Sequence, residues 1–349
     1  MRNAGMRVAT FLVIVSLLGC LGADSSPAFA SERGLWGWTR FETAVSISQD
    51  QWTSSEWVVI ATGMDFPDGL AGAPLAHVLG APLLLTSGTR LEPVVASEVT
   101  RLGARRAKVL GGRRALSDAV IDGLVAAGIP RANIERISGT DRYETARAIA
   151  ARTQSISGLP SGAVVANGRR FPDALAAAGY AARSNRPILL TETYHLPPAT
   201  RQALDAIPSG NTVIVGGTSA VSNGVASLIP GAQRIGGRDR YHTAVLIAER
   251  AQQEGVLGFN ELVIATGEQF PDALAAGPYV AARQSSLILV GWRTVPQAVD
   301  DFLRAHARSI DSVVFLGGTG AICTEARAGV NLKLHMYRSD FLNTHAWKQ

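Results

Sequence analysis

The sequence predicts an α/β protein built from three tandem copies of one module, each an α/β/α sandwich with a mainly parallel sheet. One observation behind this prediction is that four short motifs recur three times in the same order. Another is that, within each copy, continuous apolar runs of strand length alternate with segments of helical periodicity. Such alternation is typical of a parallel sheet whose two faces are both covered by helices.

The four motifs show where each copy begins and how long it is. In order, they are a [TD]R[FY]xTA segment, an FPD[GA]LA segment, an apolar strand and a Gly-Gly pair. They recur every ~100 residues, which is the size of a domain and much longer than one repeat of a solenoid. They start at Thr39, Phe66, Pro82 and Gly111, then at Asp141, Phe171, Pro187 and Gly216, and finally at Asp239, Phe270, Ser286 and Gly317.

The second copy shows the predicted order of elements most clearly. Its strands are short apolar runs, and its helices gather Ala and Ile side chains on one face. In chain order, we expect a helix over residues 142–151, a strand over 163–166, a helix over 171–183, a strand over 187–190, a helix over 199–207 and a strand over 212–215. The last of these strands ends on a Gly-Gly pair.

The repeat pattern predicts the division of the chain. We expect copies over residues 34–135, 136–233 and 234–330. Residues 331–349 match neither earlier copy and form an atypical C-terminal tail, either an added strand and tail or an unreliable end of the reading frame.

The first 30 residues have the features of a secretory signal peptide. Arg2 and Arg7 precede an apolar run over residues 8–21, and Ala28-Phe29-Ala30 forms a small-x-small cleavage site. The segment ending at Cys20 also resembles the lipobox of bacterial lipoproteins, which would place a lipid anchor on that cysteine. Both alternatives predict export. No other stretch is long and apolar enough to span a membrane.

Composition limits the classes of function. The net charge of +5 is a mild basic bias, and the chain lacks basic segments interleaved with aromatic residues, which disfavours nucleic acid as a partner. The preference for arginine over lysine fits the codon bias of a GC-rich genome. The six histidines show no paired spacing typical of metal ligands, and no nucleophile elbow or CxxC motif occurs. We therefore expect no metal, no cofactor and no enzymatic activity.

The helix-start motif combines a cap with an arginine that capping does not explain. Asp141 and Glu144 have the spacing of a capping box, which satisfies amide groups at a helix start. An arginine there opposes the helix dipole and needs a compensating acid. We expect these arginines to pair with the aspartates of the FPD motif, within a module or across a module interface, more for structure than for ligand binding. The residues concerned are Arg40, Arg142 and Arg240, with Asp68, Asp173 and Asp272.

Taken together, the motifs resemble the cell wall-binding repeat 2 family of Gram-positive surface proteins. The resemblance rests on R[FY]xTA, GxxFPDALAA, PILLT and VIVGG followed by AVS, and it covers nearly all of residues 34–330. It implies Rossmann-like or Toprim-like modules around a pseudo-threefold axis, in a secreted, actinobacterial surface protein. It also implies noncovalent attachment to an anionic secondary cell-wall polymer or a peptidoglycan-linked glycopolymer.

The predicted parallel sheets favour a ligand site at the turns that follow strands. The carboxyl ends of parallel strands are where open α/β sheets bind ligands, although a tight turn alone also explains a Gly-Gly pair. We expect arginines and exposed amides there to contact phosphate or carboxylate groups of the polymer. The candidate residues are Arg113, Arg169, Arg170, Gly111, Gly112, Gly216, Gly217, Gly317 and Gly318.

Three positions depart from the repeat pattern, and two functions remain as alternatives to polymer binding. Trp36 and Trp38 replace the small residues Ser138 and Thr140 of the second copy, and Ser286 replaces the proline that opens the strand in the other copies. The alternatives to polymer binding are an exported wall-modifying enzyme or amidase accessory protein, and an adhesin that binds protein partners.

Overall fold

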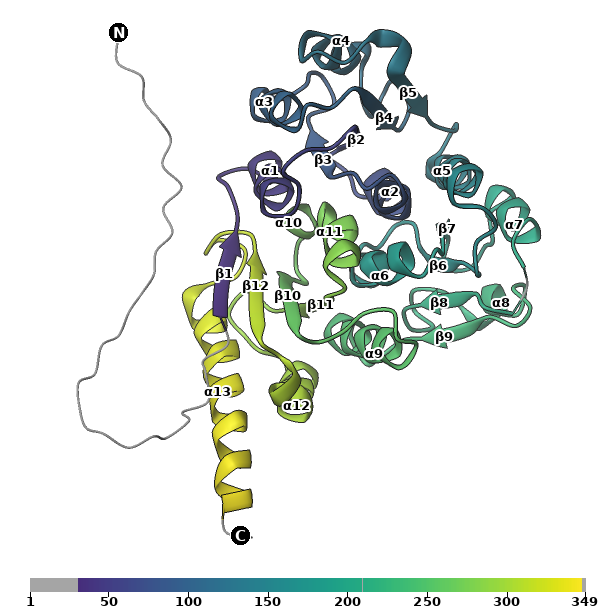
Figure 1. The fold of residues 1–349 in the computed structure, drawn as a ribbon. Helices are drawn as coiled ribbons and strands as arrows, with labels where there is room; N and C mark the ends of the chain where they lie inside the picture. The colour runs from purple at the N-terminus through teal and green to yellow at the C-terminus, as the bar shows by residue number, and fades with distance from the viewer. Residues whose placement is uncertain (1–30, 209, 347–349) are drawn as a thin grey trace, which may run out of the picture.

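Three four-stranded parallel sheets, each flanked by helices, make up the fold (Figure 1). The computed structural model describes residues 31–208 and 210–346. The predicted signal peptide and Cys20 therefore lie outside the described residues. The α/β class, the three modules and the parallel sheets predicted from the sequence are confirmed.

The first sheet has the strand order β3-β2-β4-β5. Its module contains α1 (Arg40–Gln51), β2 (Trp57–Thr62), α2 (Pro67–Val78), β3 (Leu83–Thr86), α3 (Pro93–Leu102), β4 (Arg106–Leu110), α4 (Asp118–Ala126), the 3-10 helix η1 (Arg131–Asn133) and β5 (Ile134–Ile137). Strands β2 and β3 are almost wholly buried apolar runs, and β4 is buried after its first residue, as expected for a sheet covered on both faces.

The second sheet has the equivalent order β7-β6-β8-β9. Its module contains α5 (Arg142–Ser157), β6 (Val164–Asn167), α6 (Pro172–Arg183), β7 (Ile188–Thr191), α7 (Pro198–Asp205), β8 (Val213–Val215), α8 (Asn223–Ala226) and β9 (Gln233–Ile235). The six elements predicted for this copy are all present, with ends shifted by a few residues. The fourth strand, β9, was not predicted.

The third sheet takes its fourth strand from the N-terminal end of the described chain. The module contains α9 (Arg240–Gln253), β10 (Glu261–Thr266), α10 (Pro271–Leu274), α11 (Ala276–Arg283), β11 (Ser286–Val290), α12 (Gln297–His306), η2 (Ala307–Ser309), β12 (Ser312–Leu316) and α13 (Thr324–Ala346). Strand β1 (Ser31–Leu35) pairs with β12 in parallel, from Ser31 opposite Ser312 to Leu35 opposite Leu316. The chain thus closes a ring of three modules, because β1 completes the module farthest from it in sequence.

The C-terminal segment differs from one of the expectations. Residues 331–346 continue helix α13 rather than forming an added strand. This helix packs against α12 and then points away from the three modules (Figure 1). The expected strand is wrong because the helix that starts at Thr324 runs on without a break to Ala346, over 23 residues.

One hydrophobic core holds the three modules together. The helices α2, α6 and α11 pack against one another in the centre of the ring, and one cluster of buried residues draws on all three modules (Figure 1). Small residues allow this close packing: a β-carbon on Gly179 would stand only 2.2 Å from Val280. Each module also has an outer core on the other side of its sheet. The pseudo-threefold arrangement is therefore fixed by shared burial.

Candidate functional site

The phenylalanines of the three FPD motifs meet at the centre of the ring. Phe66, Phe171 and Phe270 directly precede α2, α6 and α10, and the proline at the first position of each helix favours a helix start there. Their ring centroids are 5.6–6.0 Å apart in all three pairs. This contact brings the N-termini of the three helices, and the aspartate that follows each phenylalanine, to one end of the pseudo-threefold axis.

Each FPD aspartate lies against the first glycine of the Gly-Gly pair in its own module. A β-carbon on Gly111 would stand 2.4 Å from Asp68 Oδ2, and one on Gly216 would stand 2.5 Å from Asp173 Oδ2. Gly317 and Asp272 repeat this contact. The φ angles of these glycines are between 89° and 104°, which L side chains rarely adopt. The first glycine of each pair is therefore required both by backbone conformation and by the carboxylate beside it.

An arginine on the fourth strand secures the turn in the first two modules. Arg136 donates to the carbonyl of Gly111 at 3.0 Å, and Arg234 donates to that of Gly216 at 2.9 Å. In the third module the equivalent strand position is Gly34, and Arg327 from α13 donates to Gly317 instead. The Arg327 guanidinium would lie 3.4 Å from a β-carbon on Gly34, so the missing side chain leaves room for it.

The motif arginines bridge adjacent modules. Arg142 donates to the carbonyl of Gly168 at 2.6 Å, at the end of β6 in its own module, and Arg40 and Arg240 repeat this bond with Gly63 and Gly267. Arg40 also stands over the ring of Phe270, 5.9 Å from the centroid, and Arg240 stands 6.0 Å from that of Phe171. Each phenylalanine belongs to the module before that of its arginine, so the arginine contacts two modules at once. This contact between modules explains why an arginine occurs at a helix start.

The expected contact between these arginines and the FPD aspartates is not formed as an ion pair. The guanidinium of Arg142 instead pairs with Asp65 at 3.5 Å. Burial raises the pKa of Asp68, and the charge of Arg142 opposes this rise; the charges of Arg240 and Arg40 act likewise on Asp173 and Asp272. Each arginine therefore acts at longer range on the aspartate of the neighbouring module.

Burial dominates the electrostatics of the aspartates. Burial and, after it, the negative charge of Asp65 raise the pKa of Asp68 to about 6, against the opposing charge of Arg142. Burial also raises the pKa of Asp173 and of Asp272, in both cases opposed by a threonine hydroxyl and by the neighbouring arginine. These carboxylates are therefore less readily ionised than exposed ones.

The predicted caps are present, with one difference. Thr39 and Glu42 form a complete capping box, and the Asp141 side chain accepts from the amides of Tyr143 and Glu144. Glu144 does not bond back to Asp141. Its carboxylate accepts from the backbone and the hydroxyl of Thr140, at 2.9 and 2.8 Å, because the preceding threonine offers two donors.

Three pockets lie between adjacent modules at this end of the ring. Each is lined by the FPD aspartate and the second glycine of the Gly-Gly pair from one module, and by the helix-start motif of the next. We name them the 1–2, 2–3 and 3–1 pockets after the modules that form them, and their volumes are about 920, 470 and 370 Å³. From the sequence, we expected the turns to bind the ligand and the helix-start motif to have a structural role. In the structure, both line the same cavities.

The candidate residues differ in how free they are to bind a ligand. Gly112, Gly217 and Gly318 line the pockets, whereas the amides of Gly111, Gly216 and Gly317 donate to strand carbonyls and are already satisfied. Arg113 pairs with Asp118 at 3.0 Å and Arg169 pairs with Glu192 at 2.9 Å.

Arg170 and Arg238 are the less engaged cations of the 2–3 pocket. Both are exposed, and within residues 31–208 and 210–346 neither guanidinium has a carboxylate within 4.0 Å. Sequence analysis missed Arg238 because its position is occupied by Thr140 and Trp38 in the other copies. The strand β9 delivers it to the pocket, and that strand was not predicted.

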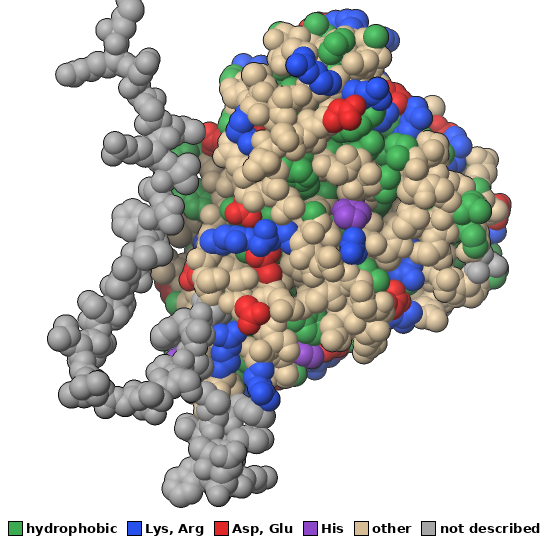
Figure 2. Space-filling view, in the orientation of Figure 1, with side chains coloured by type: hydrophobic (Ala, Val, Ile, Leu, Met, Phe, Trp, Pro, Cys, Tyr) green, Lys and Arg blue, Asp and Glu red, His purple; other side chains and the backbone are tan. Residues whose placement is uncertain are grey.

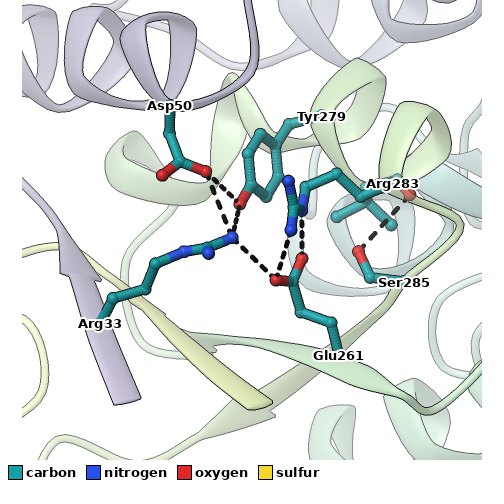
Figure 3. A network of polar contacts seen from close by, with 7 residues as sticks. Arg33, Asp50, Glu261, Tyr279, Arg283 and Ser285 are labelled. Atoms are coloured by element: carbon teal, nitrogen blue, oxygen red, sulfur yellow. Dashed lines mark hydrogen bonds and ion pairs between the residues drawn. The ribbon is translucent and has the colours of Figure 1, made fainter. Parts of the chain in front are cut away.

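Polar networks join the modules away from the Phe contact. Figure 3 shows Arg33 of β1 reaching Glu261 at 2.7 Å and Asp50 at 3.3 Å, with the Tyr279 hydroxyl donating to Asp50 at 2.8 Å. Arg283 completes the network through Glu261. At the interface of modules 2 and 3, a similar set contains Tyr180, Arg186, Arg250 and Glu254. These networks fix β1 and α11 in place, so they support the pockets without lining them.

The face of the molecule drawn in Figure 2 does not carry a single extended basic patch. On the face drawn in Figure 2, basic and acidic side chains are interspersed. Within the described part of the chain, no helix has the length and apolarity needed to cross a membrane. The same part contains no group of three or more His, Cys, Asp or Glu side chains placed to hold a metal ion.

A known family matches all three modules. The family is described as "Cell wall binding domain 2 (CWB2)", and it matches residues 35–121, 136–226 and 234–327.

Two curated relatives are from Bacillus subtilis (strain 168). The chain is 30% identical over 295 residues to N-acetylmuramoyl-L-alanine amidase LytC, covering 84% of this chain and 57% of that protein. It is 30% identical over 292 residues to the amidase enhancer, covering 83% of this chain and 38% of that protein.

Two solved structures have the same fold. Cwp8 from Clostridium difficile superposes with a TM-score of 0.76 at 25% identity, over 87% of this chain and 52% of that one. Cwp6 from the same organism superposes with a TM-score of 0.75 at 24% identity, over 88% of this chain and 48% of that one. The chain thus spans about half the length, or less, of the relatives that it matches.

Proposed function

This chain belongs to the cell wall binding domain 2 family, and we propose that its three inter-module pockets attach it noncovalently to an anionic polymer of the cell wall. The observation that carries the proposal is the threefold repetition of one pocket, built each time from the same two motifs of adjacent modules. A repeated ligand such as a polymer can occupy all three. The module then acts at the cell wall or cell surface after export.

The 2–3 pocket has the charge that such a ligand requires. Its lining contains four arginines against two aspartates. One of the aspartates, Asp239, is engaged as a helix cap, and the pKa of the other, Asp173, is raised by burial. Phosphate and carboxylate groups bind well to guanidinium forks and to free amides at helix starts. The arginines are Arg169, Arg170, Arg238 and Arg240.

The 1–2 pocket has a weaker charge bias. It contains Arg113, Arg114 and Arg142 against three aspartates, and Arg113 and Arg142 already have acidic partners. Retention then comes from several modest contacts. On a rigid ring, the second and third contacts with one polymer are intramolecular, so avidity can exceed the affinity of any single pocket by ~10²–10⁴.

We propose that these modules bind and do not catalyse. Each pocket offers one buried carboxylate. The other aspartates of the 1–2 and 2–3 pockets cap a helix or pair with Arg142, so they do not supply the free second acid that hydrolysis of a glycan or an amide normally uses. The similarity to an amidase and to an amidase enhancer supports a second candidate, in which the ring delivers or assists an amidase at the wall. Incubation of walls with the purified protein, with and without an amidase, distinguishes the two by the release of muropeptides.

Sedimentation with purified cell walls tests the proposal. The protein is expected to pellet with walls that carry their anionic polymers and to remain in solution after these are removed with hydrofluoric acid. Binding is also expected to weaken as salt rises, because exposed charges are screened. Equal pelleting with stripped and intact walls would refute polymer recognition, and capture of a wall protein instead would support the adhesin alternative.

A further inference from the structure

The 3–1 pocket differs in chemistry from the other two. We propose that it binds an uncharged pyranose ring of the wall polymer, stacked on Trp36 and Trp38, while the 2–3 pocket holds the charged groups of the same chain. This inference rests on the proposed function and assigns different parts of the polymer to different pockets.

Two exposed tryptophans at the mouth of the 3–1 pocket carry the inference. Trp36 is 48% exposed and Trp38 is 90% exposed, and both line the pocket. Their ring centroids are 6.0 Å apart, with the rings nearly perpendicular at 83°. Exposed indole rings are costly in water unless a partner covers them, and clustered ones mark binding surfaces. A pair of them beside a cavity therefore indicates a ligand with an apolar face.

The tryptophans are confined to this pocket. The positions of Trp36 and Trp38 are occupied by Ser138 and Thr140 in the second copy of the motif, and by Gly236 and Arg238 in the third. Since Arg238 is an exposed cation of the 2–3 pocket, the same position supplies a charge in one pocket and an aromatic ring in another.

The Gly-Gly turn of the third module also lacks the charged residues found in the first module. In the first module it reads Gly-Gly-Arg-Arg-Ala from Gly111, and in the third it reads Gly-Gly-Thr-Gly-Ala from Gly317. Arg40 and Asp272 are consequently the only ionisable residues that line the 3–1 pocket in the described chain. Burial raises the pKa of the Asp272 carboxyl, and the charge of Arg40 opposes this rise. The pocket therefore carries little net charge.

The turn is also shaped to place one indole ring. A β-carbon on Gly318 would stand 3.5 Å from the six-membered ring of Trp36, so the glycine backbone lies under the indole. On the far side of the same turn, the indole nitrogen of Trp292 donates to the carbonyl of Thr319 at 3.4 Å. Trp36 is thereby supported by backbone, and Trp38 stands against its edge.

A sugar ring matches these features better than an anion does. A pyranose in its chair form presents C–H groups on its faces and hydroxyls around its edge. The negative face of an indole attracts the C–H groups, while Thr39, Gln269 and Asp272 offer polar atoms to the hydroxyls. The pocket volume of about 370 Å³ is at the small end of the range of ~300–1,000 Å³ for small-molecule sites.

The test uses neutral oligosaccharides, made by removing the phosphate groups of purified wall polymer with hydrofluoric acid. We expect them to bind the purified protein, with quenching of tryptophan fluorescence and no dependence on salt. Trp38→Ala is expected to weaken this binding on the order of tenfold, the loss of one aromatic stacking contact. Trp38→Phe should recover most of the affinity, because it restores a stacking ring.

Two controls keep the outcome specific. Tyr194→Ala removes another aromatic ring, which is 86% exposed and outside the pocket, and should leave binding unchanged. Inorganic phosphate should bind no more weakly to Trp38→Ala than to the unaltered protein. Failure of the neutral oligosaccharides to bind, while the protein still pellets with intact walls, would overturn this inference and leave the proposed function standing. Failure to pellet with intact walls would overturn the proposed function itself.

Discussion

The carboxylate of Asp173 lies against Gly216, with its Oδ2 atom 2.5 Å from the place where a β-carbon would stand. This contact, repeated in the other two modules, links the FPD motif to the Gly-Gly pair. Because the aspartate also faces the arginine of the next module, one contact shapes both a turn and an inter-module pocket.

The first prediction concerns this close approach. Gly216→Ala should lower the free energy of unfolding by about 2 kcal/mol or more, because it adds a steric clash to a strained backbone. Gly128→Ala is the matched control: its φ of +102° is similar to the +98° of Gly216, but no atom lies within 4 Å of its added β-carbon. Urea unfolding of both variants separates the clash from the strain. Equal losses would show that the carboxylate does not restrict the turn.

The second prediction concerns the pH dependence of stability. The folded-state pKa of Asp68 is raised from 3.8 to about 6, so this carboxyl favours the folded state when it is protonated. Its contribution is present below pH ~4 and is lost as pH rises through ~6, by at most about 3 kcal/mol. Asp68→Asn should therefore be more stable than the unaltered protein at pH 7, with a smaller change between pH 4 and pH 7.

Thermal unfolding across this pH range measures the effect. Asp205→Asn serves as the control, because Asp205 is exposed and should leave the pH profile as it is. A pH profile for Asp68→Asn that matches the unaltered protein would show that Asp68 ionises normally in the folded state.

The third prediction concerns the network that closes the ring. Tyr279→Phe removes the hydroxyl that accepts from Arg33 at 3.0 Å and donates to Asp50 at 2.8 Å. We expect a loss of about 1–3 kcal/mol in the free energy of unfolding, because the charged, part-buried side chains of Arg33 and Asp50 lose a hydrogen-bond partner. Hydrogen exchange of β1 should accelerate, since Arg33 anchors that strand.

Tyr180→Phe, at the interface of modules 2 and 3, is the control. It should lower the free energy of unfolding by a similar amount without affecting hydrogen exchange of β1. Unchanged exchange in β1 would mean that the strand is held by its ladder with β12 alone.

The sequence predicted the modules and the motifs, but not how they join. The predicted strands, such as β6 and β7, were recognisable because they are continuous apolar runs. Strands β1, β5 and β9 were missed because they are short edge strands with exposed polar residues, such as Glu32 and Gln233. Each of them carries the chain from one sheet to the next helix start. Without them, the Gly-Gly turn and the helix start appear as separate sites.

The contacts of the motif arginines also could not be predicted in full from the sequence. Their repetition indicated a role beyond capping, either within a module or across a module interface, and the structure places them between modules. The contact is nevertheless with a glycine carbonyl and a neighbouring aromatic ring rather than with the aspartate. Which of several nearby acceptors a guanidinium contacts depends on side-chain geometry, which a sequence pattern does not encode.

The most direct test of the account measures polymer binding by a variant of the 2–3 pocket. In Arg170→Glu/Arg238→Glu, both weakly engaged cations of this pocket become acidic. Arg105→Glu/Arg131→Glu makes the same charge change outside the pockets. Titration with wall polymer is expected to show a loss of affinity of about tenfold or more and a weaker salt dependence for the pocket variant only. Equal affinity and equal salt dependence in both variants would contradict the claim that the inter-module pockets hold the polymer.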